Sequence, residues 1–234
     1  MKALLFISLL PSIVLMYFIY KKDKVEREPI MLLMKMFFLE ALSCVYVVYL
    51  EKFAGKINDI FFFDSPSVHT IFKAFIGVAL IEEFSKYIVL KKLTWKADCF
   101  NCRFDAIVYS VFTTLGFATY ENILYVFEYG FRTGVARAVI SVPAHMMFGV
   151  CMGIYYGTAK YYSTYSNNKK AKLNLFYAIL MPTLLHGFFD YCLFVETRLS
   201  IIVFYLFVVL MYVVSFRNIN RYSDEDFYFK IDNE

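Results

Sequence analysis

The run LSIIVFYLFVVLMYVVSF, residues 199–216, contains no charged side chain. An α-helix rises about 1.5 Å per residue, so about 20 such residues cross the roughly 30 Å hydrocarbon core of a bilayer. The run therefore predicts a transmembrane helix. Apolar residues make up 60% of all 234 residues, where a soluble domain has roughly 45–50%.

On the N-terminal side of this run lie further long apolar stretches, so the sequence predicts about seven spans and hence an all-α, polytopic transmembrane helix bundle. The predicted spans are 3–20, 30–50, 70–90, 105–127, 137–159, 175–195 and 199–216. The second is the least uniform, because Lys35 and Glu40 interrupt it. The phenylalanine-rich stretch 53–69 is predicted to be an interfacial loop.

Basic residues alternate between the connections of these spans. They are enriched in 21–29, 91–104 and 160–174 and sparse in the other loops. By the positive-inside rule, the N-terminus lies outside and the C-terminus in the cytoplasm of a multi-pass cell-membrane protein. We expect one transmembrane domain over 1–216, with the ionisable motifs in 70–195, and a polar cytoplasmic tail over 217–234.

Charge and cysteine usage exclude other classes of protein. The net charge is only +4 and there is no basic domain, so no nucleic-acid partner is expected. Five scattered cysteines do not make a disulfide framework. Cys99 and Cys102 form a lone CxxC, which is half of a zinc site, and we expect no zinc there because a second pair is lacking.

The predicted spans contain ionisable and amide side chains that are costly in a bilayer. Each charged group costs roughly 2.5–3.5 kcal/mol on insertion scales, so these residues are functional candidates. The candidate catalytic residues are Glu82, Glu83, Lys86, Glu121, Asn122, His145, His186 and Asp190. Glu82, His145 and His186 each fall within about 7 Å of the midpoints of their spans, which predicts one shared site.

Helical spacing predicts which of these side chains meet. Lys86 follows Glu82 by four residues and Glu83 by three, so it can pair with either carboxylate. The carboxylate that is not fully paired is a candidate general base. His186 and Asp190 are also four residues apart, so Asp190 can orient the imidazole.

Four short elements in this region resemble those of a known family. They are EEFSK (82–86), FATYEN (117–122), PAH (143–145) with Gly149 four residues later, and HGFFD (186–190). In this order, on successive spans, they resemble the signature of the PrsW family of intramembrane proteases. That family is similar to the CAAX prenyl endopeptidases, which share a glutamate pair in a helical bundle.

The resemblance implies roles for individual residues. Glu82 would activate water, Glu83 would support it, and His186 with Asp190 would lie near the oxyanion. The substrate would be a single-pass membrane protein in the bilayer, typically an anti-sigma factor cleaved at site 1. The sequence departs from the CAAX-type pattern at Lys86, at Glu121 in place of a histidine and at Asp190 in place of an asparagine, which makes His145 a candidate partner of Glu82.

Three alternatives stay open. No cofactor is expected, yet the histidines and carboxylates also suit a zinc-dependent protease, with His145, His186, Glu83 and Glu121 as ligands. HExxH, the usual zinc-protease motif, is absent from the sequence. A proton-coupled transporter or receptor would use the same buried acids and histidines. An inactive scaffold that binds membrane partners is the third alternative.

Overall fold

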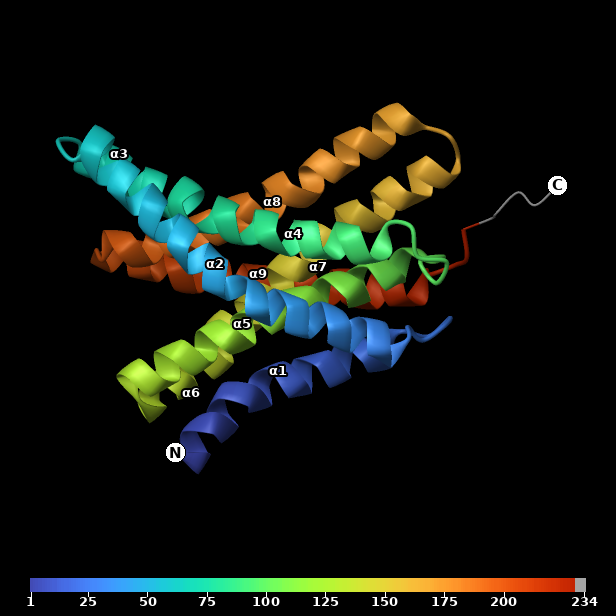
Figure 1. Ribbon diagram of the computed structural model, residues 1–234, viewed down its shortest axis with the longest axis horizontal. Coiled ribbons are helices and arrows are strands. Elements are labelled where there is room, and N and C mark those ends of the chain that lie inside the picture. Colours follow the sequence, from blue (N-terminus) through green and yellow to red (C-terminus); the bar gives the residue numbers. More distant parts are fainter. Residues whose placement is uncertain (230–234) are drawn as a thin grey trace.

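The computed structural model describes residues 1–229 of the chain, and these are almost entirely helical (Figure 1). The elements in order are α1 (Lys2–Lys22), α2 (Ile30–Phe62), α3 (Pro66–Phe72), the π-helical η1 (Lys73–Leu80), α4 (Ile81–Thr94), α5 (Arg103–Tyr129), α6 (Phe131–Val139), α7 (Ser141–Thr164), α8 (Asn168–Val195) and α9 (Arg198–Asp224). The described part contains no strand, which confirms the predicted all-α class.

Five helical segments are long and apolar enough to cross a membrane. They are α1, α2, α6 together with α7, α8 and α9. The predicted spans 70–90 and 105–127 are helical but do not meet this criterion. They correspond to η1–α4 and to α5, which carry several of the ionisable residues, and most of α5 is covered by other helices. A helix shielded from lipid need not be apolar throughout, so the number seven stays a prediction.

The helices run roughly along one common direction, with α5 at the centre (Figure 1). Helix α5 packs against α1, α2 and α7, and α8 packs against α7 and η1. The connection 23–29, the connection 95–102 and the C-terminal segment all lie at one end of the bundle, and the N-terminus lies at the other. The connections richest in basic residues therefore gather at a single end.

Small residues bring α7 unusually close to α5. Gly149, Gly153 and Gly157 recur at every fourth position, on one face of α7. A Cβ atom at Gly153 would lie 2.6 Å from the Cα of Ile107, and one at Gly157 would lie 2.8 Å from the carbonyl oxygen of Arg103. Small residues at this spacing allow close backbone approach in membrane bundles. The glycines therefore determine how α5 and α7 align.

The change Gly153→Ala is expected to destabilise the protein by about 1–3 kcal/mol, the usual cost of overpacking. The matched control is Gly55→Ala in α2, where a new Cβ meets no atom within 4 Å and alanine favours the helix. Thermal unfolding in detergent should show a lower midpoint for Gly153→Ala and an equal or higher midpoint for Gly55→Ala. A Gly153→Ala protein as stable as the wild type would contradict the close packing of α5 and α7.

Two predicted boundaries differ from the structure. The stretch 53–69 is not a loop, because α2 continues to Phe62 and α3 begins at Pro66. Helix α9 continues to Asp224, well into the predicted tail 217–234. Beyond it, the backbone N–H of Phe229 donates to the carbonyl of Asn101 at 2.7 Å, so the chain returns to the start of α5. Residues 230–234 of the predicted tail lie outside the described residues.

Candidate active site

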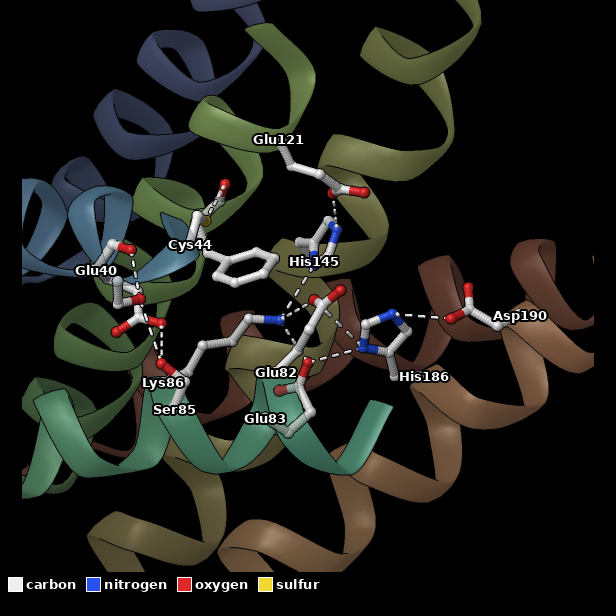
Figure 2. Close-up of polar contacts among 12 residues, drawn as sticks. Glu40, Cys44, Glu82, Glu83, Ser85, Lys86, Glu121, His145, His186 and Asp190 are labelled. Atoms are coloured by element: carbon white, nitrogen blue, oxygen red, sulfur yellow. Dashed lines mark hydrogen bonds and ion pairs between the residues drawn. The ribbon is translucent and has the colours of Figure 1, made fainter. Parts of the chain in front are cut away.

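Lys86 lies at the centre of a buried polar cluster on α4 (Figure 2). Its side chain has no exposed surface, and its Nζ donates to Glu82 Oε2 at 3.0 Å and to Glu83 Oε1 at 2.6 Å. The helical spacing predicted a contact with either carboxylate, and the structure shows both. The ammonium group therefore compensates a buried carboxylate pair that would otherwise be costly.

His145 on α7 joins this cluster through one ring nitrogen. Its Nδ1 lies 3.4 Å from Lys86 Nζ, and its Nε2 lies 3.0 Å from Glu121 Oε2 on α5. An ammonium group can only donate, so Nδ1 acts as the acceptor and Nε2–H donates to Glu121. Glu121 therefore fixes the neutral tautomer whose Nδ1 lone pair faces the ammonium group of Lys86.

His186 on α8 lies between two carboxylates. Its Nδ1 is 3.0 Å from Glu83 Oε1 and 3.9 Å from Glu82 Oε2, and its Nε2 is 3.4 Å from Asp190 Oδ2. The contact with Asp190 is the one that the helical spacing predicts. Both ring nitrogens face acceptors, which favours the doubly protonated imidazolium. The rings of His145 and His186 are 5.3 Å apart, so three helices bring their polar groups to one place.

Asn122 is buried but lies outside this contact set. Its Nδ2 donates to the carbonyl of Ser8 on α1 at 3.0 Å, and its Oδ1 accepts from Arg137 Nε at 3.1 Å. Arg137 on α6 also forms an ion pair with Glu121, with 2.7 Å between its NH2 nitrogen and Oε2. Asn122 and Arg137 thus hold Glu121 in position. The sequence reasoning missed Arg137 because a basic residue at the start of a predicted span is ordinarily assigned to the membrane surface.

A second set of contacts that the sequence did not predict joins α2 to α4. Glu40 is fully buried and accepts a hydrogen bond from Ser85 Oγ at 3.0 Å, and Tyr46 is 2.6 Å from the same hydroxyl. Lys35, the nearest basic residue in the sequence of α2, is exposed and forms no ion pair with Glu40 among the described residues. Glu40 therefore stabilises the packing of α2 on α4.

A cavity of about 380 Å³ adjoins the cluster. Its polar lining includes Glu82, Glu121, His145, His186 and Asp190, together with Glu51 and Arg137, and the rest is mainly apolar. Glu83 and Lys86 are fully buried and do not line it. Of the two adjacent glutamates, Glu82 is thus the one in contact with a space that could hold water and a substrate.

The same cluster has donors that suit a metal ion. One ligand atom from each of Glu82, Glu83 and His145 lies within 4.8 Å of the others, and Glu83 Oε2 is buried without a hydrogen-bond partner among the described residues. Two carboxylates and an imidazole fit a catalytic zinc site, which takes three protein ligands. Of the predicted zinc ligands, His186 lies near Glu83, whereas Glu121 contacts His145 on the side away from the pair. Lys86 Nζ contacts the same three groups, so the ammonium and a metal would compete for them.

Comparisons with known proteins place nearly the whole chain among curated relatives. Residues 28–216 match a family model described as PrsW family intramembrane metalloprotease. Curated relatives named Protease PrsW come from Clostridioides difficile (35% identity, covering 94% of this chain and 92% of the relative), Oceanobacillus iheyensis (35%, covering 96% and 98%) and Bacillus subtilis (29%, covering 91% of each). No solved structure matches the chain significantly.

Proposed function

Since the chain belongs to the PrsW family of intramembrane proteases, we propose that it cleaves a single-pass membrane protein by water that Glu82 activates. The chain is a multi-pass membrane peptidase, and the proposal concerns its substrate class and its general base. The observation that supports Glu82 as the base is its position, because it contacts both the buried Lys86 and the cavity.

The proposed reaction is one hydrolysis. Glu82 takes a proton from water, and the hydroxyl oxygen adds to the carbonyl carbon of the substrate. The Nε2–H of His186 has only a long contact with Asp190, 3.4 Å, and it donates to the carbonyl oxygen as negative charge develops there. Glu82 then returns the proton to the leaving nitrogen as the C–N bond breaks. Glu83 and Lys86 hold Glu82 in place. His145 assists the two proton transfers, from water to Glu82 and from Glu82 to the leaving nitrogen.

The matched family is described as a metalloprotease family, and Glu82, Glu83 and His145 would hold the ion. A bound metal would lower the pKa of water and polarise the carbonyl. Glu121 would then orient His145 from behind, as carboxylates commonly do for metal-binding histidines. We propose that Glu82 activates water without a metal. The ammonium group of Lys86 pairs with both glutamates and already supplies the positive charge that a metal ion would bring to them.

The cavity also limits the form of the substrate. In a helix the N–H and C=O groups of the peptide bonds are paired with each other in backbone hydrogen bonds. A transmembrane segment must therefore unwind locally before water can attack one of its peptide bonds. A site-1 cleavage of the anti-sigma-factor type cuts the peptide near the outer membrane surface. The cavity suits such a cut because Glu121, Tyr125 and Arg137 of its lining belong to the last part of α5 and to α6, and α6 lies at the end of the bundle that holds the N-terminus (Figure 1).

Reconstituted vesicles test this function against the transporter alternative. The full-length protein is placed in vesicles with a tagged single-pass protein, an anti-sigma factor being the first to try, and with an internal pH indicator. We expect two substrate fragments and no proton uptake. Proton uptake without fragments would support a transporter, and neither signal across a panel of single-pass proteins would support a scaffold.

The proposed orientation is N-terminus outside and C-terminus in the cytoplasm. The connections 23–29 and 95–102, with the C-terminal segment, share one end of the bundle, and basic connections stay in the cytoplasm. A reporter that is active only in the cytoplasm, fused after Glu234, should be active, and a reporter that is active only outside should be silent. The opposite pattern would contradict the orientation and place the Glu121 side of the cavity toward the cytoplasm.

A further inference from the structure

A second cluster of metal-ligating side chains lies at the end of the bundle that holds the C-terminus, away from the catalytic cavity. Cys102 ends the connection before α5, Asp105 lies in the first turn of α5, and Asp226 follows α9. One ligand atom from each lies within 4.8 Å of the other two. Cys102 and Asp105 are buried, with exposed fractions of 0% and 1%.

Helix capping explains only half of the carboxylate oxygens in this cluster. Asp105 Oδ2 accepts from the backbone N–H groups of Asn101 at 2.9 Å and Cys102 at 2.6 Å. Asp226 Oδ1 accepts from the backbone N–H groups of Arg103 at 3.1 Å and Phe104 at 3.0 Å. The other oxygens, Asp105 Oδ1 and Asp226 Oδ2, are buried and have no hydrogen-bond partner in the described part of the chain. Each carboxylate is thus held by backbone groups and keeps one oxygen free.

No basic side chain forms an ion pair with these carboxylates in the described part of the chain. The guanidinium of Arg103 donates to Thr158 at 3.2 Å and lies over the ring of Tyr222, and it forms no ion pair with Asp105 or Asp226 among residues 1–229. Asp23, which is 3% exposed, adds a further carboxylate that interacts with Asp226 and has both oxygens unpartnered. Buried charges without a counter-charge are strongly unfavourable, so these carboxyl groups either hold a proton or face a cation, and the two unpartnered oxygens beside the Cys102 thiol fit a cation.

We propose that Cys102, Asp105 and Asp226 bind a divalent transition metal, with Zn²⁺ as the favoured ion. A thiolate with two carboxylates suits zinc, whereas calcium and magnesium prefer oxygen alone. Water or Asp23 would take the fourth position. The ion would join the C-terminal segment to the start of α5, where Tyr228 and Cys102 already form a backbone bridge. In this site only the second cysteine of the lone CxxC is a ligand, and aspartates from elsewhere in the chain supply the other protein ligands.

Cobalt binding tests this site directly. The full-length protein in detergent is stripped with a chelator, dialysed and titrated with Co²⁺, which gives a thiolate-to-cobalt absorption band when sulfur is a ligand. We expect the band in the wild type and its loss in Cys102→Ser. Serine is a good N-cap, so this variant keeps the helix start and should fold. Cys99→Ser and Cys44→Ser are the matched controls, and both should keep the band.

Two further variants separate this site from the catalytic cluster. Asp226→Asn should weaken Co²⁺ and Zn²⁺ binding by more than the roughly 10–100-fold that loss of an outer partner costs. Glu82→Gln should leave the cobalt band unchanged, whatever it does to proteolysis. A wild type without the band, or a band that is equal in Cys102→Ser, would overturn the proposal and leave the carboxylates as protonated helix caps.

Discussion

Replacement of Glu82 by glutamine is expected to abolish cleavage while membrane insertion and folding stay intact. Glutamine has nearly the same shape, and its amide oxygen can still accept from Lys86 Nζ, which lies 3.0 Å from Glu82 Oε2. It cannot take a proton from water, so the loss falls on the chemical step. General base catalysis contributes about 10²–10⁴-fold, and the rate in single turnovers of a tagged substrate should fall by at least this factor.

The matched control is Glu40→Gln. Glu40 is also fully buried and near α4, but it bonds to Ser85 and does not line the cavity. Glutamine can accept the same hydrogen bond, so this variant should keep its cleavage rate. Full activity in Glu82→Gln would move the base to another carboxylate, with Glu121 next because it also lines the cavity.

Replacing each histidine with alanine, together with chelator and zinc treatment, decides between the metal-free and the metal-dependent mechanism. Without a metal, His186→Ala removes an oxyanion donor, which costs about 3–4 kcal/mol in the transition state. His145→Ala then removes a partner in proton transfer, with a rate loss of about 10²–10⁴-fold. Chelators should leave the wild-type rate unchanged, and added zinc should not increase it.

A metal-dependent enzyme would behave in another way. His145 is the imidazole whose ligand atom lies with those of Glu82 and Glu83, so His145→Ala should empty the site. Chelators should inhibit the wild type and zinc should restore it. Metal analysis must be done in a Cys102→Ser background, because the second cluster would otherwise contribute zinc. One equivalent of zinc in active Cys102→Ser protein, lost on His145→Ala, would contradict the metal-free proposal.

The all-α fold class and much of the candidate site could be predicted from the sequence. Both depend on the spacing of residue types within single helices. The contacts of Lys86 with Glu82 and Glu83, and of His186 with Asp190, follow from positions three or four residues apart on one helix. The shared depth of His145 and the glutamate pair follows from the rise per residue. The amino-acid sequence alone therefore contains the information that these predictions need.

Contacts between distant segments could not be predicted in the same way. Asn122 points toward α1 and Arg137, although it follows Glu121 directly, because neighbouring residues of a helix face different directions. Arg137 reaches Glu121 because α6 is a separate helix, and hydropathy alone merged it with the next span. Cys102 meets Asp226 across more than half of the chain, and no local pattern indicates that contact.

The glycine face of α7 has a consequence for the chemistry. His145 stands one helical turn before Gly149, so the depth at which α7 rests on α5 also sets the distance from His145 to Glu121. A slip by one turn would move the imidazole by about 5.4 Å and out of hydrogen-bond reach. The alignment of the reacting groups is thus set by backbone contact as far away as Gly157, on the same helix. Variants that lose activity while every polar residue is intact should therefore be found along this face.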